Sequence, residues 1–325
     1  MTQARPNLLL ITSDQQHWST LGVLNPKIKT PNLDRLAAMG TNFTRAYCPN
    51  PTCTPTRASL ITGMYPSTHG AYTLGTKLDE RVPTLGDHLR PHGYRSTLIG
   101  KAHFQPLRST PDCESVESYP TLRDLGFWRR FNETHTPWYG FDRVELARNH
   151  ADESHVGQHY AIWLEERGLT DWRDYFHAIE GRADMRETCP TAGSKAPPIV
   201  EGPGYGWRGD MSWQLPAELH YTAWTAERTN AAIEAATDAC EPFFVWSSYH
   251  DPHPPYCVPE PWASMYDPAD MEVGGFVEGE FNDMPEPHRM TRDPDADFGR
   301  FNADGKGNHG YHSHVGVTED ELLGR

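Results

Sequence analysis

"RPNLLLITSDQQ", residues 5–16, is the stretch of sequence that decides the fold class. A short continuous apolar run, Leu8 to Ile11, lies between Pro6 and polar residues, which is typical of a buried β-strand. The predicted strand runs out into Asp14 and Gln15. Their side-chain oxygens are the kind of ligand that Ca²⁺ and Mg²⁺ prefer. The first predicted strand therefore leads into a candidate metal site.

Helices and further strands alternate after this strand. Proline near the start and glycine at the end predict helices at 30–40 and 53–63, and apolar periodicity predicts a third helix at 216–240. Strands are expected at 94–99 and 242–250. This alternation indicates an α/β fold with a mainly parallel sheet sandwiched by helices. The long helix should bury one stripe, made of Leu219, Ala223, Ala226, Asn230, Ile233 and Ala236.

Two regions have weaker patterns. Residues 104–215 are predicted to be a long irregular insertion with some helix, for example near 155–168, and we expect them to shape the substrate pocket. Residues 258–325 are polar and rich in Pro, Asp and Gly, which predicts a loop-rich segment.

Composition limits the function. The chain has 325 residues, 37% of them hydrophobic, and a formal net charge of −15, so nucleic acid is not an expected partner. No apolar run is long enough for a transmembrane helix, and residues 1–16 do not resemble a signal peptide, so we expect a cytoplasmic protein without membrane contact. The six cysteines do not suggest a disulfide scaffold. Homo-oligomerisation stays open.

Polar groups follow three of the predicted strands. They are Asp14 and Gln15, then Lys101 and His103, then His250 and His253. Because the carboxyl ends of parallel strands meet at one edge of a sheet, we expect these groups to converge there.

Cys53 lies at the start of the predicted 53–63 helix, and Arg57 follows one turn later. On its own, Cys53 could be a packing residue, a metal ligand or a nucleophile. The helix amides, Arg57 and Lys101 favour an anion, while His103 and His253 can transfer protons near neutral pH. Together with a hard cation at Asp14 and Gln15, this set fits the hydrolysis of an anionic ester.

Four segments resemble the type I sulfatases of the alkaline-phosphatase-like superfamily. Cys53-Thr54-Pro55-Thr56-Arg57 with the following "ASLITG" resembles the C-x-P-x-R signature of that family. "GKAHF" (100–104), "HDPHPPY" (250–256) and "RPNLLLITSDQQ" resemble its other conserved segments, in the same order.

The resemblance implies a mechanism. Cys53 would be oxidised to formylglycine by a maturation enzyme, and the aldehyde would be held as its hydrate. One hydroxyl would attack sulfur, the alcohol would leave, and loss of a proton from the second hydroxyl would regenerate the aldehyde. In this scheme Arg57 stabilises the hydrate, and Lys101 and His253 bind the sulfate. His103 is the base in the last step.

The resemblance also implies a bound cation and a substrate class. Asp14, Gln15 and modified Cys53 would bind Ca²⁺, or alternatively Mg²⁺, and His253 could help to protonate the leaving oxygen. His250 would lie beside the substrate in a role that stays open. The implied substrate is a small-molecule sulfate ester; the alternative is a phosphonate monoester or phosphodiester on the same scaffold.

One departure from the family bears on activity. The family has a late Asp-His-Gly or Asp-Asn-Gly motif that supplies two further metal ligands, and no convincing copy occurs before Arg325. We therefore expect residues 1–325 to be an incomplete N-terminal sulfatase α/β domain without the C-terminal subdomain. A truncated, inactive sulfatase-like protein is a further alternative.

Overall fold

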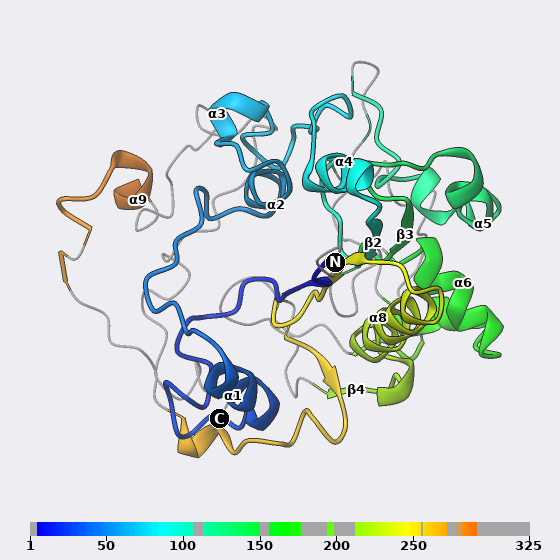
Figure 1. Ribbon diagram of the computed structural model, residues 1–325. Helices are drawn as coiled ribbons and strands as arrows, with labels where there is room; N and C mark the ends of the chain where they lie inside the picture. Colours follow the sequence, from blue (N-terminus) through cyan, green and yellow to red (C-terminus); the bar gives the residue numbers. More distant parts are fainter. Residues whose placement is uncertain are drawn as a thin grey trace.

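The computed structural model describes residues 5–106, 109, 113–149, 156–176, 194–197, 212–254, 256–271, 278–279 and 281–290. Their central feature is a four-stranded sheet in the order β1-β5-β2-β3. Figure 1 shows two of its strands, β2 and β3, side by side. Its strands are β1 (Leu8–Thr12), β2 (Arg95–Gly100), β3 (Arg143–Leu146) and β5 (Phe243–Ser248). All three pairings are parallel, which confirms the predicted α/β class.

Helices connect these strands. They are α1 (Pro31–Met39), α2 (Cys53–Thr62), α3 (Pro66–His69), α4 (Leu85–Leu89), α5 (Leu125–Thr134), α6 (Gln158–Glu166), α8 (Tyr221–Asp238) and α9 (Glu286–Met290). Short 3₁₀ turns are η1 (Arg90–His92), η2 (Thr121–Arg123), η3 (Trp172–Tyr175), η4 (Ala217–Leu219) and η5 (Pro268–Asp270). A separate two-stranded sheet pairs β4 (Ser212–Trp213) with β6 (Val258–Pro259).

The two faces of the sheet follow the period of two that strands impose on side chains. Leu98 of β2 and its register partner Trp246 of β5 belong to the large buried cluster that includes Ala58 of α2. The next residue, Ile99, faces the other way and packs in a smaller cluster with Ala236 of α8. Accordingly, α4 and α8 lie on opposite sides of β2 in Figure 1, and both helices contact this strand.

The sequence prediction missed structure in the 104–215 region. The expected helix near 155–168 is present as α6, but α5 and β3 are regular elements, and β3 extends the main sheet. The predicted apolar stripe of α8 was also partly wrong: Asn230 is exposed, whereas Ala236 is buried as expected. The buried face of this helix is made of Tyr221, Trp224, Thr225, Thr229 and Ala236.

One side of the sheet carries exposed apolar side chains. Among the described strands β1 pairs only with β5, so it forms an edge of the sheet. Leu9 and Ile11 of β1 are 45% and 51% exposed, and α1 has no buried residue among its nine. Leu33, Leu36 and Met39 of α1 and Phe43 after it are exposed as well. No described helix has the length and apolar character needed to cross a membrane.

Candidate active site

The start of α2 places Cys53 at the head of a helix. Cys53 is the first helical residue, after an extended Thr52, and the helix ends at Gly63 with a left-handed φ of 69°. Both ends of the helix agree with the start and the end that Pro55 and Gly63 predict. Because the first amides of a helix lack acceptors within it, the Cys53 side chain begins in a locally positive environment.

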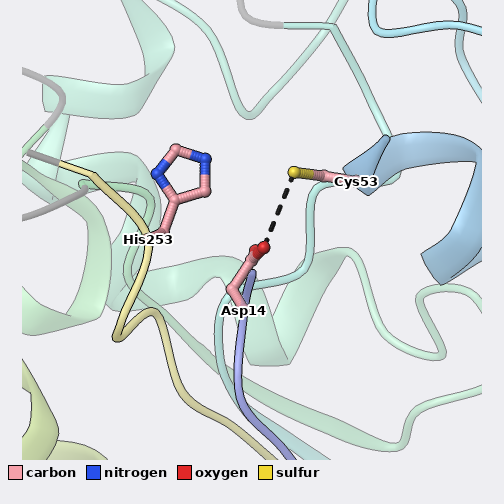
Figure 2. Close-up of side chains that lie close together, drawn as sticks. All are labelled: Asp14, Cys53 and His253. Carbon is pink, nitrogen blue, oxygen red and sulfur yellow. Dashed lines mark hydrogen bonds between the residues drawn. The ribbon is translucent and has the colours of Figure 1, made fainter. Parts of the chain in front are cut away.

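Three strand and helix ends meet at Cys53. Its Sγ lies 3.8 Å from Oδ1 of Asp14, which follows β1 (Figure 2), and 3.7 Å from Nζ of Lys101, which follows β2. Lys101 also forms a short ion pair with Oδ2 of Asp14. Lys101 is fully buried and Cys53 is partly exposed. The predicted convergence of these groups is therefore present.

Arg57 connects this group to the sheet. Its Nη2 lies 3.2 Å from Oδ2 of Asp14, and its Nη1 donates to the carbonyl of Lys101 and to Oγ of Ser248, both at 2.7 Å. Ser248 itself donates to the same Lys101 carbonyl. The guanidinium thus fixes the relative positions of α2, β1, β2 and β5. Sequence analysis did not identify Ser248, because a serine at the end of a strand carries no local signal.

The charge balance at Asp14 favours its ionised form. Burial opposes ionisation, but Lys101, Arg57 and His253 outweigh burial and hold the pKa of the Asp14 carboxyl well below its usual range. Asp14 is therefore a carboxylate in the folded protein at neutral pH.

His253 lies across from Cys53 and Asp14 (Figure 2) and is partly buried. Its Nδ1 lies 2.6 Å from the Pro254 carbonyl, which can only accept, so Nδ1 carries the proton. When the ring is neutral, its Nε2 is an acceptor or a metal ligand. Asp14, Cys53 and His253 each offer a ligand atom within 4.8 Å of the others.

These residues fit the start of a divalent-cation site. Asp14 supplies a carboxylate, and Gln15, which is exposed and has a φ of 58°, follows it with an amide oxygen. Ca²⁺ takes about six to eight oxygen ligands, which is more than these side chains provide.

The other two predicted histidines are buried. His250 is fully buried, and its Nε2 donates to the carbonyl of Ala147. Burial, together with Lys101, lowers the pKa of His250 well below its ordinary value. His103 is 2% exposed, and its Nε2 lies 3.2 Å from Nη2 of Arg148. The substrate and base roles of these histidines stay predictions.

Asp251 is a further residue that sequence analysis missed. Its carboxylate accepts from the hydroxyls of Tyr221 and Thr222 at the start of α8, at 2.7 and 2.6 Å. Its carbonyl accepts from the backbone N–H of Asp14 at 3.3 Å. Asp251 thus attaches the turn that carries His253 to β1. Its place in "HDPHPPY", between two candidate histidines, was the available signal.

Comparisons with known proteins agree with this geometry. The Sulfatase family model matches residues 6–274. The "Uncharacterized sulfatase YidJ" of Escherichia coli (strain K12) is 26% identical over 289 residues, covering 88% of this chain and 46% of the relative. The human "N-acetylgalactosamine-6-sulfatase" is 37% identical over 162 residues, covering 39% of this chain and 31% of the relative.

A solved structure is similar over nearly the whole chain. The phosphonate monoester hydrolase of Agrobacterium radiobacter superposes with a TM-score of 0.60 at 25% identity, covering 98% of this chain and 55% of that chain. The present chain spans about half the length of the curated relatives that it matches. The range of this chain that the family model matches includes Cys53, Lys101 and His253.

Proposed function

Because this chain belongs to the sulfatase family, we propose that it hydrolyses sulfate esters of small molecules, with position 53 as the nucleophile. The observation that carries the proposal is the position of Cys53 at the head of α2, within 3.8 Å of both Lys101 and Asp14. Burying a cation and a carboxylate beside one partly exposed thiol costs desolvation free energy. Such groups are typical of functional sites.

The cations of the site would bind the anionic ester. Lys101 would donate to a sulfate oxygen, and the amides at the start of α2 would face the same charge. Arg57 is held by three acceptors, so its guanidinium would keep its position during the reaction and contribute a fixed positive charge.

Formylglycine formed from Cys53 would supply a hydrated aldehyde as the oxygen nucleophile, and Ca²⁺ (or Mg²⁺) at Asp14 and Gln15 would supply positive charge beside it. The residues of the chain would place and move protons around it. His253, whose Nδ1 proton is engaged by Pro254, would exchange protons with the leaving oxygen through Nε2. His103 would serve the later proton transfer, and His250 would hold the β3 end beside the substrate.

A phosphonate monoester or phosphodiester is the second candidate substrate. The similarity to the Agrobacterium radiobacter hydrolase supports it. Both substrate classes are singly charged and tetrahedral at the reacting atom, so the cations alone do not separate them. Comparing kcat/KM for a nitrophenyl sulfate with that for a nitrophenyl phosphonate ester discriminates between the two.

We further propose a cytoplasmic protein that interacts with a formylglycine-generating maturation enzyme and does not bind nucleic acid. The net charge of −15 supports the last point.

The test begins with the chemistry of position 53. After co-expression with a maturation enzyme, mass spectrometry of the peptide covering 45–64 should show a loss of about 18 Da at Cys53. Cys48 lies exposed in the same peptide, so Cys48→Ala is the matched control: conversion should persist in it and vanish in Cys53→Ala. Conversion with cation-dependent turnover of nitrophenyl sulfate supports the proposal. Conversion without turnover of either ester favours the inactive alternative.

A further inference from the structure

The turn after β2 is held by a buried carboxylate. Oε1 of Glu117 accepts from the backbone N–H of His103 at 2.7 Å, and Oε2 accepts from the N–H groups of Phe104 and Gln105, both at 2.9 Å. Glu117 is only 1% exposed. Three successive amides therefore converge on one side chain that lies outside the family segments quoted above.

This carboxylate supports an unfavourable backbone conformation. His103 has a φ of 54°, in the left-handed region that residues with a β-carbon seldom adopt. Successive amides pointing to one side of such a turn form a concave anion-binding arrangement. Glu117 fills this arrangement from within the protein, so the turn keeps its shape without a ligand.

Arg148 contacts the same histidine from the end of β3. Its Nη2 lies 3.2 Å from Nε2 of His103 and can only donate, so Nε2 is the acceptor and the ring proton is on Nδ1. Arg148 is 1% exposed. Its charge also stabilises the carboxylate of Glu117: burial raises the pKa of Glu117, and Arg148 with the three amides opposes this rise. The net effect is a raised pKa for Glu117, because burial is the largest of these influences. A buried carboxyl group thus holds the backbone of His103, and a buried guanidinium contacts its ring.

We propose that Glu117 and Arg148 are positioning residues for His103, Glu117 fixing its backbone and Arg148 fixing a neutral ring with the proton on Nδ1. The catalytic importance of this arrangement rests on the proposed function; the arrangement itself does not. The proton on Nδ1 changes the expected chemistry of His103. A ring whose Nε2 accepts from Arg148 carries its proton on Nδ1, so Nδ1 must lose this proton before it could act as the base in the proposed function.

The first test reads the tautomer directly. A long-range ¹H–¹⁵N NMR spectrum of the full chain distinguishes the two neutral tautomers of histidine from each other and from the imidazolium. The chain has 17 histidines, so His103→Gln identifies the His103 signals by their loss. We expect the Nδ1–H pattern between about pH 6 and pH 8. An Nε2–H pattern or an imidazolium in the wild type overturns the proposal, whatever the variants do.

Variants then assign the cause. Arg148→Met removes the donor but keeps an unbranched side chain, and we expect the His103 signals to lose the pure Nδ1–H pattern. Arg148→Lys keeps a donor and a charge, and it should restore the pattern. A purely structural role for Arg148 would alter stability but leave the tautomer unchanged, and that result in a folded Arg148→Met protein overturns the assignment to Arg148.

The second test concerns Glu117. In Glu117→Gln, amide hydrogen exchange at His103, Phe104 and Gln105 should accelerate by about tenfold or more, because glutamine offers one acceptor oxygen where Glu117 uses two. The amides of β2 should exchange as in the wild type. Glu114→Gln makes the same charge change at an exposed position three residues away and is the matched control.

Equal exchange in Glu117→Gln and Glu114→Gln contradicts the role of Glu117. If Glu117→Gln does not fold, slow exchange of these three amides in the wild type supports the role, and rapid exchange contradicts it. None of these measurements needs formylglycine or turnover, so failure of the proposed function stays distinguishable from failure of this inference.

Discussion

Protonation of His159 should weaken the fold in mild acid. Nδ1 of His159, in α6, accepts from the backbone N–H of Leu146 at 3.0 Å, at the end of β3. An imidazolium has no acceptor and would lose this bond. Burial lowers the pKa of His159 from 6.5 to about 4, with Glu145 opposing this shift and Arg143 reinforcing it. The ring also packs edge-on against Trp128.

The direction of the effect follows from the lowered pKa. Between pH 6.5 and about 4 the unfolded chain binds a proton at His159 that the folded chain does not, so stability falls as pH falls through this window. The full difference corresponds to about 3 kcal/mol, of which about 2 kcal/mol is lost by pH 5. Because His159 as a residue is only partly buried, we expect a loss of about 1–2 kcal/mol at pH 5.

The assay is urea unfolding followed by tryptophan fluorescence, at about pH 7.5 and about pH 5. In His159→Asn, an amide oxygen can replace Nδ1 as the acceptor but cannot be protonated, so this variant should lose about 1–2 kcal/mol less than the wild type between the two pH values. His135→Asn, at an exposed position after α5, is the matched control and should follow the wild type. Equal pH dependence in His159→Asn and the wild type would refute the reasoning.

Three further predictions test the sheet and the site. Gly100 has a φ of 98°, and a β-carbon there would lie 1.9 Å from the carbonyl oxygen of Ser248, so Gly100→Ala should cost about 3 kcal/mol or more; an unchanged melting temperature contradicts this close approach. Lys101→Met removes a buried partner of Asp14 and should lower the free energy of unfolding by about 3 kcal/mol. The variant should also lose the stabilisation that added inorganic sulfate gives the wild type; if sulfate still stabilises the variant, the anion binds elsewhere. Thr84 forms a capping box at the start of α4, so Thr84→Ala should cost about 1 kcal/mol in urea unfolding, and no loss would show that the cap is redundant.

The parts of the fold that could be predicted have local causes. β1, β2 and β5 are short apolar runs, and the start of α2 follows from proline and glycine punctuation. Because all three strands are parallel, their ends had to meet, and Asp14, Lys101 and Cys53 are together for that reason.

The parts that could not be predicted depend on distant partners. β3 reads "RVEL", and its Glu145 is balanced by Arg228 of α8, which follows 83 residues later in the chain. No periodicity indicates such a strand. Similarly, α8 buries Thr229 rather than Asn230 because Thr229 bonds to Ser247 of β5 at 2.8 Å, and hydrophobicity gives no weight to such a contact. The contacts of Glu117 and Arg148 with His103 also could not be predicted, because no local sequence pattern indicates them.

The exposed apolar side chains of β1 and α1 have a consequence for the protein in concentrated solution. At neutral pH the formal charge of −15 makes molecules repel one another, and this repulsion keeps exposed side chains such as Leu36, Met39 and Phe43 from meeting. Acid protonates carboxylates, and salt screens those that remain, so both remove the barrier to self-association. Turbidity should therefore rise in mild acid, and more steeply with added salt, even where each molecule is still folded.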